Sequence, residues 1–302
     1  MAGALLYYFL HLSDVAHSLR VLIVLAYGIG TPAATYAGNF YSHQLAASLC
    51  LGALVLLFAL AEVDLDHPRA FLSGLLLGAA VISEFPVMIV IVGVGVYAWL
   101  KFTPAQVRWI IAGAALPVAV LTLYNVIAFE TIVPVNYRLV VQGQHIQRTG
   151  LLHLTAPSLE AVWGLTFSLF RGLFVRAPWL LLALPGTVLW WRQQAELRTE
   201  LLLLGCIVLS LLCFVAAYPR WWGGAASGPR HLVLALPFLM LLTVPLFQAI
   251  WNWSHWYRWP AQATIVALIL VSIGLTWSEA AAGQTFPPET MHNPWATHTW
   301  PH

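Results

Sequence analysis

The feature that most constrains this chain is a succession of apolar runs joined by polar connections. The ten runs lie near residues 2–12, 19–35, 44–61, 70–83, 85–100, 108–129, 177–191, 200–218, 231–250 and 261–277. Only 8% of the 302 residues are charged, whereas charged residues make up roughly 25% of a soluble domain. Continuous apolar runs favour helices over the alternating strands of a membrane barrel. The sequence therefore predicts an all-α, polytopic transmembrane helical bundle over residues 1–277, with about ten membrane helices, and an external tail over residues 278–302.

Several runs are too short or too interrupted to cross a bilayer alone. A full crossing needs about 20 apolar residues, and residues 2–12 read like the latter part of a membrane helix whose beginning is absent. That stretch has no basic flank and no small-residue cleavage site, so it is a poor signal peptide. Glycine and proline interrupt the runs at residues 28–32 and 83–86. Such breaks survive at membrane depth only where the backbone is buried in protein or lines a wet cavity.

Basic residues in the short loops predict the orientation, because cytoplasmic loops carry an excess of lysine and arginine. One set of alternating loops contains Arg20, Arg69, Lys101, Arg108, Arg192, Arg198 and Arg258. The opposite set contains only Arg220 and Arg230, once the long loop over residues 130–176 is set aside. The first set is therefore expected in the cytoplasm, with both termini outside. Within the long loop, residues 161–175 are mostly apolar around Arg171, which predicts an external helix along the membrane interface.

The stretch from Arg220 to Arg230 is the strongest candidate for a binding site. Glycines between the two arginines permit tight turns and a close approach of backbone to a ligand. Each guanidinium group can donate two parallel hydrogen bonds to a phosphate, and Trp222 can stack on a sugar or pack on lipid. The alternative is that both arginines reach up to lipid headgroups. We expect a site for a lipid phosphate or pyrophosphate here, with Arg171 as a further donor-binding residue.

Two polar residues in apolar surroundings are candidates for the lining of a cavity. Glu84 lies in an apolar turn, and an ionisable group near lipid depth suggests function, although it could also be a plain helix cap. His43 follows Tyr41 and Ser42 at an external turn. A single histidine at such a place is seldom a metal ligand, so no metal site is predicted there.

Further candidates flank the long external loop. Tyr124 and Asn125 lie at the end of one apolar run and could line a cavity or contact an acceptor. Tyr137 and Arg138 open the long loop and could contribute to the binding of a phosphate-bearing donor.

Several function classes are excluded by what the chain lacks. It has no Walker loop, GxSxG, HExxH or dinucleotide-binding sequence. The formal charge of +2 comes without a basic cluster, which argues against a nucleic-acid partner. The tail histidines lack the spacing of a zinc site. No cofactor is predicted, and a divalent metal would need ligands supplied by residues upstream of Met1.

Five segments, in order, resemble one family. Residues 31–43 contain Thr-Pro, Tyr36 and Tyr-Ser-His, similar to a "GTP…Y…YSH" turn. Residues 74–86 contain GLLLG and Glu-Phe-Pro, similar to "GLLLGLA…EYP", and Tyr124-Asn125 with Tyr137 resembles "YN…FG…Y" without its glycine. Residues 171–178 resemble "RGLF…P", and residues 221–230 resemble "WWGG…YGPR". These are patterns of bacterial polytopic glycosyltransferases of the GT-C type, in the protein-mannosyltransferase and aminoarabinose-transferase superfamily.

The resemblance implies an enzyme of the bacterial inner membrane that transfers a hexosyl or pentosyl group from a polyprenyl-phosphate-linked donor at the outer face. The catalytic carboxylate of that family lies in the first external loop, and this chain begins beyond it, so no residue here inherits that role. The chain is therefore expected to be the carboxy-terminal fragment of such an enzyme or a shortened relative that no longer catalyses. The alternative is a non-enzymatic subunit of a larger membrane complex. A transporter is disfavoured because internal symmetry and ionisable groups at mid-membrane are not evident.

Overall fold

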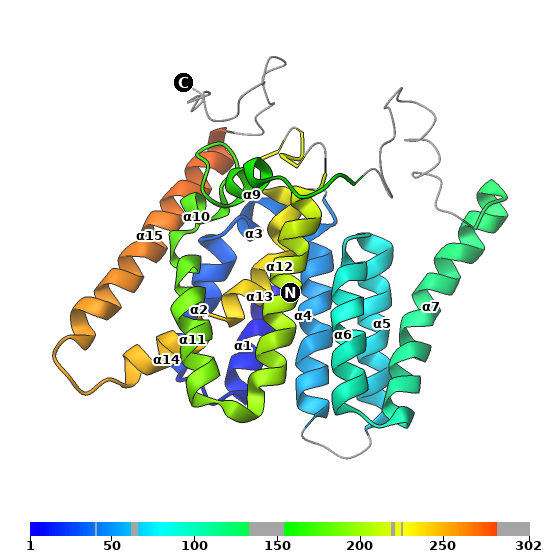
Figure 1. Cartoon of the computed structure of the whole chain (residues 1–302), viewed down its shortest axis with the longest axis horizontal. Helices are drawn as coiled ribbons and strands as arrows, with labels where there is room; N and C mark the ends of the chain where they lie inside the picture. Colours follow the sequence, from blue (N-terminus) through cyan, green and yellow to red (C-terminus); the bar gives the residue numbers. More distant parts are fainter. Residues whose placement is uncertain (40, 62–65, 133–153, 219–220, 225, 283–302) are drawn as a thin grey trace.

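The computed structural model describes residues 1–39, 41–61, 66–132, 154–218, 221–224 and 226–282, and this part of the chain contains helices and loops but no strand (Figure 1). The longer helices are α1 (Ala2–Leu12), α2 (His17–Ile29), α4 (His43–Leu60), α5 (His67–Ser83), α6 (Val87–Lys101), α7 (Pro104–Phe129), α11 (Ala183–Gln193), α12 (Arg198–Ala216) and α15 (Arg258–Ala282). The shorter helices are α3 (Ala33–Ala37), α9 (Leu159–Thr166), α10 (Leu173–Arg176), η2 (Pro178–Leu182), η3 (Ala195–Leu197), η4 (Arg230–Ala235), α13 (Leu236–Leu241) and α14 (Val244–Asn252). The expected all-α class is confirmed.

Each of the ten apolar runs coincides with a helix or with a series of short helices, but not all of them are long. Within the described residues, the segments long and apolar enough to cross a membrane are five in number: His43–Leu60, Pro104–Phe129, Ala195–Ala216, Arg230–Asn252 and Arg258–Ala281. The helices α1, α2, α5 and α6 are apolar but shorter. Glycine and proline explain two of these short helices, because α2 ends before the Gly-Thr-Pro turn and α5 ends before Pro86. Ten crossings therefore remain a prediction.

Local sequence signals set the beginnings of the two helices that pack most closely. At the start of α7, Thr103 accepts a hydrogen bond from the backbone N–H of Gln106, whose side chain in turn accepts one from the backbone N–H of Thr103. This capping box satisfies two amide groups that the helix itself cannot bond. At the start of α5, the side chain of Asp66 accepts a hydrogen bond from the Arg69 amide, and Pro68 fits the first turn.

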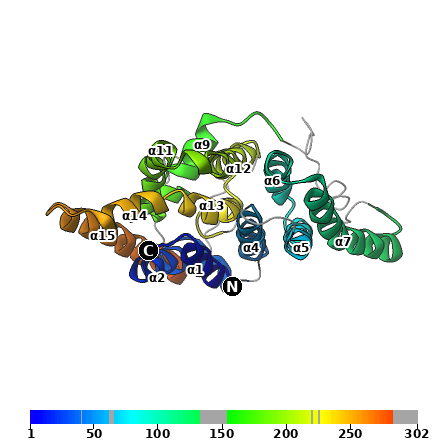
Figure 2. The same ribbon diagram turned by 90° about the horizontal axis from the view of Figure 1, so that it is seen from below.

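Glycines allow α5 and α7 to approach until their backbones touch. A Cβ atom added to Gly74 would lie 1.9 Å from the carbonyl oxygen of Ile110, and one added to Gly113 would lie 2.0 Å from that of Phe71. Gly74 and Gly78 are four residues apart and so share one helix face. The GLLLG segment is thus a helix-packing face in this structure. Figures 1 and 2 show α7 at one edge of the bundle and α15 toward the opposite edge.

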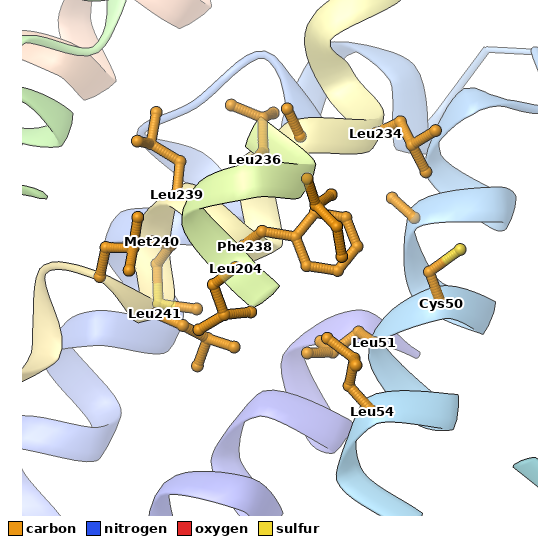
Figure 3. Packing of buried hydrophobic residues seen from close by; sticks show 14 of the residues in the cluster. Cys50, Leu51, Leu54, Leu204, Leu234, Leu236, Phe238, Leu239, Met240 and Leu241 are labelled. Atoms are coloured by element: carbon orange, nitrogen blue, oxygen red, sulfur yellow. The ribbon is translucent and has the colours of Figure 1, made fainter. Parts of the chain in front are cut away.

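The core lies where a broken helix passes between its neighbours. The segment Arg230–Asn252 is 83% buried, the largest share among the five long segments. It divides into η4, α13 and α14, with Pro237 and Pro245 in the first turns of α13 and α14. Figure 3 shows Phe238 and Met240 among buried side chains of α4 and α12, including Leu51 and Leu204. This buried, broken helix begins at Arg230 and so positions the candidate site.

The bundle has two distinct ends. One end, which we call the site end, carries residues 30–39, 41–43, 84–86, 154–176, 217–218, 221–224, 226–231 and the last turns of α15 (Figure 1). The other, the opposite end, carries the C-terminal ends of α1, α4, α6, α11 and α14. The helix termini at the opposite end contain the basic residues that the orientation argument assigned to the cytoplasm: Arg20, Arg69, Lys101, Arg108, Arg192, Arg198 and Arg258.

The predicted external helix over residues 161–175 is wrong as a single element. The structure has α9 over Leu159–Thr166 and α10 over Leu173–Arg176, with a turn between them. The hydroxyl group of Ser168 accepts a hydrogen bond from the Arg171 amide at 3.0 Å and donates one to the carbonyl of Gly164 at 2.7 Å. These bonds close a turn between α9 and α10, and the Arg171 side chain is buried in the protein next to this turn.

Candidate functional site

A cavity of about 310 Å³ opens among elements that are far apart in the sequence. Its lining includes His43 at the start of α4, Glu84 in the turn before α6, and His231 in η4. Aromatic and apolar side chains of α12 and its end complete one wall, among them Phe214 and Tyr218. The cavity therefore combines ionisable groups with an apolar wall, at the site end of the bundle.

A carboxylate and an imidazole are paired at this cavity. The Nδ1 atom of His43 lies 2.5 Å from Oε1 of Glu84, and the hydroxyl group of Ser42 donates a hydrogen bond to the same oxygen at 2.7 Å. Burial would raise the pKa of Glu84, but the hydrogen bonds and the charge of its neighbours hold that pKa below its ordinary value. Glu84 is also the residue at which α5 ends. Glu84 thus both ends a helix and lines the cavity.

Aromatic rings hold His43 in place. Its ring is stacked on Tyr41 with centroids 5.8 Å apart, and it meets Tyr36 and His231 edge-on at 5.8 and 5.6 Å. Tyr36 is itself fixed, since its hydroxyl group donates to the carbonyl of Ser227 and accepts from the Ser227 amide. The imidazole therefore has a set orientation. Among the described residues, no group of three or more potential ligands could hold a metal ion.

Glycines in left-handed conformations shape the loop before η4. Gly223, Gly224 and Gly228 have φ of +81°, +68° and +65°, values that side-chain-bearing residues rarely adopt. A Cβ atom on Gly223 would lie 3.0 Å from Nε of Arg230, and one on Gly228 would lie 3.1 Å from Cδ of Arg176. The glycines thus let two arginine side chains lie directly against the backbone.

Two arginines stabilise this loop, one by hydrogen bonds to its carbonyl groups and one through an ion pair with a carboxylate that the loop also contacts. Arg171 is fully buried, and its guanidinium group donates to the carbonyls of Ala226 and, at 2.9 Å, Gly224. Arg176 makes a two-pronged ion pair with Glu279 of α15, with donor–acceptor distances of 2.6 and 2.9 Å. The same carboxylate accepts a hydrogen bond from the Gly228 amide at 2.8 Å. Arg171, which the sequence suggested as a donor-binding residue, is therefore committed to backbone carbonyls.

Arg230 differs from these two arginines. Its guanidinium carbon lies 5.6 Å from the ring centre of Tyr41, a geometry of attraction between a cation and an aromatic face. Its Nε is buried and has no hydrogen-bond partner in the described part of the chain, and no described carboxylate forms an ion pair with it. Arg230 is not part of the cavity lining, whereas the next residue, His231, is. An unpaired cation thus lies beside the cavity.

The remaining predicted site residues are dispersed. Trp222 is half-buried and packs edge-on against Trp221, whose ring lies over Gly164 of α9. Tyr124 is 57% exposed on α7, and the buried Asn125 bonds to the carbonyl of Leu121. Neither residue lines the described cavity. Arg220, Tyr137 and Arg138 lie outside the described residues.

Sequence reasoning missed Arg176, Glu279, Tyr36 and His231 as contributors. The predicted boundary between bundle and tail at residues 277 and 278 falls inside α15, which continues to Ala282, and this placed Glu279 in the tail. For Glu279, the available signal was a charged residue within one helical turn of the end of an apolar run, since that run ends at residue 277. A helix that continues past the end of its apolar run can place such a charged side chain at the site end, as α15 does with Glu279. Comparison with protein-family models, with curated proteins and with solved structures finds no match to this chain.

Proposed function

We propose that this chain is an integral protein of the bacterial inner membrane that binds a polyprenyl phosphate through Arg230 at its outer face. We further propose that it transfers a sugar from such a lipid, as a GT-C-like glycosyltransferase or the carboxy-terminal part of one. The ten apolar runs would form the membrane helices, with the site end outside. The observation that carries the proposal is the arginine with a buried, unpartnered Nε beside the cavity.

The chemistry of Arg230 supports a phosphate ligand. A buried donor without a partner is unfavourable unless a ligand satisfies it. A guanidinium group satisfies a phosphate with two parallel, charge-assisted hydrogen bonds. Gly223 has no side chain and packs directly against the Arg230 side chain, so the loop leaves no room for a further residue there. In a membrane, the anion at this depth would be that of a lipid headgroup or lipid-linked donor, and we favour the polyprenyl phosphate that the resemblance implies.

A non-enzymatic membrane subunit is the second candidate, and the other charged groups favour it. Arg171 and Arg176 act as supports for the loop. Of the carboxylates at the site end, Glu84 is paired with His43 and Glu279 with Arg176, while Glu160 is exposed on α9. In this alternative the loop over residues 221–231 would be a packing surface for other subunits, and Arg230 would pair with one of their carboxylates.

Binding of undecaprenyl phosphate to the purified chain in nanodiscs separates the two candidates. Loss of a two-pronged phosphate contact costs about 1.5–3 kcal/mol, so Arg230→Ala should weaken binding roughly ten- to a hundred-fold. Arg230→Lys should recover part of the affinity, because an ammonium group cannot reproduce the planar fork. The matched control is Arg198→Ala at the opposite end, where Arg198 lies over Trp191. Equal affinity of Arg230→Ala and Arg198→Ala for the lipid would contradict the proposal and favour the subunit.

A further inference from the structure

We propose that His43 and Glu84 form a proton-accepting couple for the hydroxyl group of an acceptor bound in the adjoining cavity. This inference rests on the proposed sugar transfer and deepens it. The transfer needs a group that removes the acceptor proton. The couple fills that role with residues that the structure places at one cavity wall.

The pairing determines which nitrogen of His43 can accept a proton. An ionised carboxylate only accepts hydrogen bonds, so the Nδ1 atom that lies 2.5 Å from Glu84 must carry the hydrogen. The neutral ring then keeps its lone pair on Nε2. Within the described residues no group forms a hydrogen bond with Nε2 of His43. That nitrogen is therefore available to a ligand.

Neighbouring side chains fix the orientation of both His43 and Glu84. Ser42 donates to the same carboxylate oxygen as His43, which fixes the carboxylate. The rings of Tyr36, Tyr41 and His231 fix the imidazole on several sides. A base held in one orientation loses little entropy when an acceptor arrives. Glu84 acts here as a positioning residue, and His43 is the group that touches the acceptor.

The cavity wall indicates the class of acceptor. Phe85, Phe214, Val215 and Tyr218 line the cavity together with the couple. Apolar and aromatic side chains favour the burial of an apolar body, while the imidazole recognises one hydroxyl group. We therefore expect an alcohol on a largely apolar molecule, such as a lipid alcohol, rather than a free sugar.

The proposed step balances within these residues and the two substrates. The O–H bond of the acceptor breaks and its proton moves to Nε2 of His43. The acceptor oxygen bonds to the anomeric carbon of the donor, and the bond from that carbon to the phosphate oxygen breaks. The electron pair stays on the lipid phosphate, which Arg230 neutralises. The imidazolium that forms is stabilised by the carboxylate of Glu84.

The first test needs no substrate. In nanodiscs, the full chain labelled with ¹⁵N-histidine should show the His43 resonance, identified by its loss in His43→Asn, as the tautomer with hydrogen on Nδ1. Glu84→Leu should remove that preference, because Nδ1 loses its acceptor. A His43 ring with its hydrogen on Nε2 in the wild-type chain would overturn the proposal, whatever the protein binds.

The second test uses undecaprenyl-phosphate-linked glucose as donor and n-octanol as acceptor. His43→Asn should lower octyl glucoside formation by about a hundred-fold or more, while undecaprenyl phosphate binding stays unchanged. Imidazole added to His43→Gly should restore part of the rate, which a structural role of His43 would not allow. His17→Asn at the opposite end is the matched control.

The outcomes separate the two proposals. A wild-type chain that does not bind undecaprenyl phosphate would refute the proposed function. A chain that binds the lipid but forms no octyl glucoside, or forms it equally well as His43→Asn, would refute the proton-accepting couple and leave lipid binding intact.

Discussion

Each end of the bundle holds a carboxylate, buried at the opposite end and partly buried at the site end, and the two carboxylates have different partners. At the opposite end, Glu200 of α12 is 5% exposed and accepts a hydrogen bond from Tyr97 at 2.9 Å. Lys101 lies 3.2 Å from the same oxygen. At the site end, Glu84 pairs with the imidazole of His43, and nearby Arg230 forms no ion pair with any carboxylate that the structure describes.

The difference separates a carboxylate paired with a lysine from a carboxylate that is paired with an imidazole and lines a cavity. Glu200 and Lys101 neutralise each other and join α6 to α12. The described cavity is lined instead by residues of the site end, including Glu84. A carboxylate acts as a support where its partner is a permanent cation in a closed contact. It can take part in proton transfer where its partner is an imidazole that faces a cavity.

The largest effect on stability is expected from the ion pair that fixes the site end. Arg176→Met should lower the free energy of unfolding by about 3 kcal/mol, the lower end of the range for removing one partner of a buried pair, because the two side chains are 11% and 16% exposed. Glu279 would keep only the Gly228 amide as a donor. Titration with SDS in detergent micelles measures this loss. The double variant Arg176→Met/Glu279→Leu should recover most of it, and a double variant as unstable as the single one would show that the pair is not the cause.

A smaller loss is expected at the opposite end. Lys101→Met should lower the free energy of unfolding by about 1.5–3 kcal/mol, the range for a hydrogen bond to a charged group. Glu200 would keep its bond from Tyr97. Undecaprenyl phosphate binding should be unchanged, because Lys101 lies at the opposite end. If Lys101→Met weakened lipid binding as much as Arg230→Ala, the claim that the lipid binds at the site end and not at the opposite end would be contradicted.

The smallest effect concerns pH. The pKa of Glu84 is lowered from 4.5 by its hydrogen bonds to His43 and Ser42, against the opposing effect of burial. A lowered pKa in the folded state stabilises the fold fully above the pKa of the unfolded chain, and this stabilisation is lost as pH falls through the folded-state pKa. The stability advantage of the wild-type chain over Glu84→Gln should therefore shrink on acidification below about 4.5. Thermal unfolding in detergent at several pH values tests this, and an advantage that grows in acid would contradict it.

Much of the fold was predictable from the sequence because burial in lipid or protein demands long apolar runs. The ten runs matched helical segments, and local signals such as the Thr103–Gln106 capping box marked a helix start. The positions at which helices are interrupted were less predictable. Arg171 sits within an apolar stretch that favours a helix, but its buried bonds to Gly224 and Ala226 favour a turn instead.

The site was predictable only in part, since its contacts join distant positions. Arg230 and the glycines were visible as a local pattern. The partners Arg176 and Glu279 are separated by 103 residues, and His43 meets Glu84 from another helix. No periodicity or motif records such a pairing, because it depends on how the helices pack. Tyr124 and Asn125 were misleading for the same reason: α7 carries them away from the cavity.

The closeness of α5 and α7 has a consequence for biosynthesis. An apolar segment leaves the translocon for lipid according to its own length and hydropathy. Pro104–Phe129 meets both conditions and is only 17% buried in the folded chain, so it can enter the bilayer without partners. α5 has 17 residues, and its glycine face fits α7 backbone to backbone. In the proposed ten-helix arrangement, the longer helix, synthesised second, would hold the shorter one in the bilayer, and a bulky side chain at Gly74 or Gly113 would remove that contact.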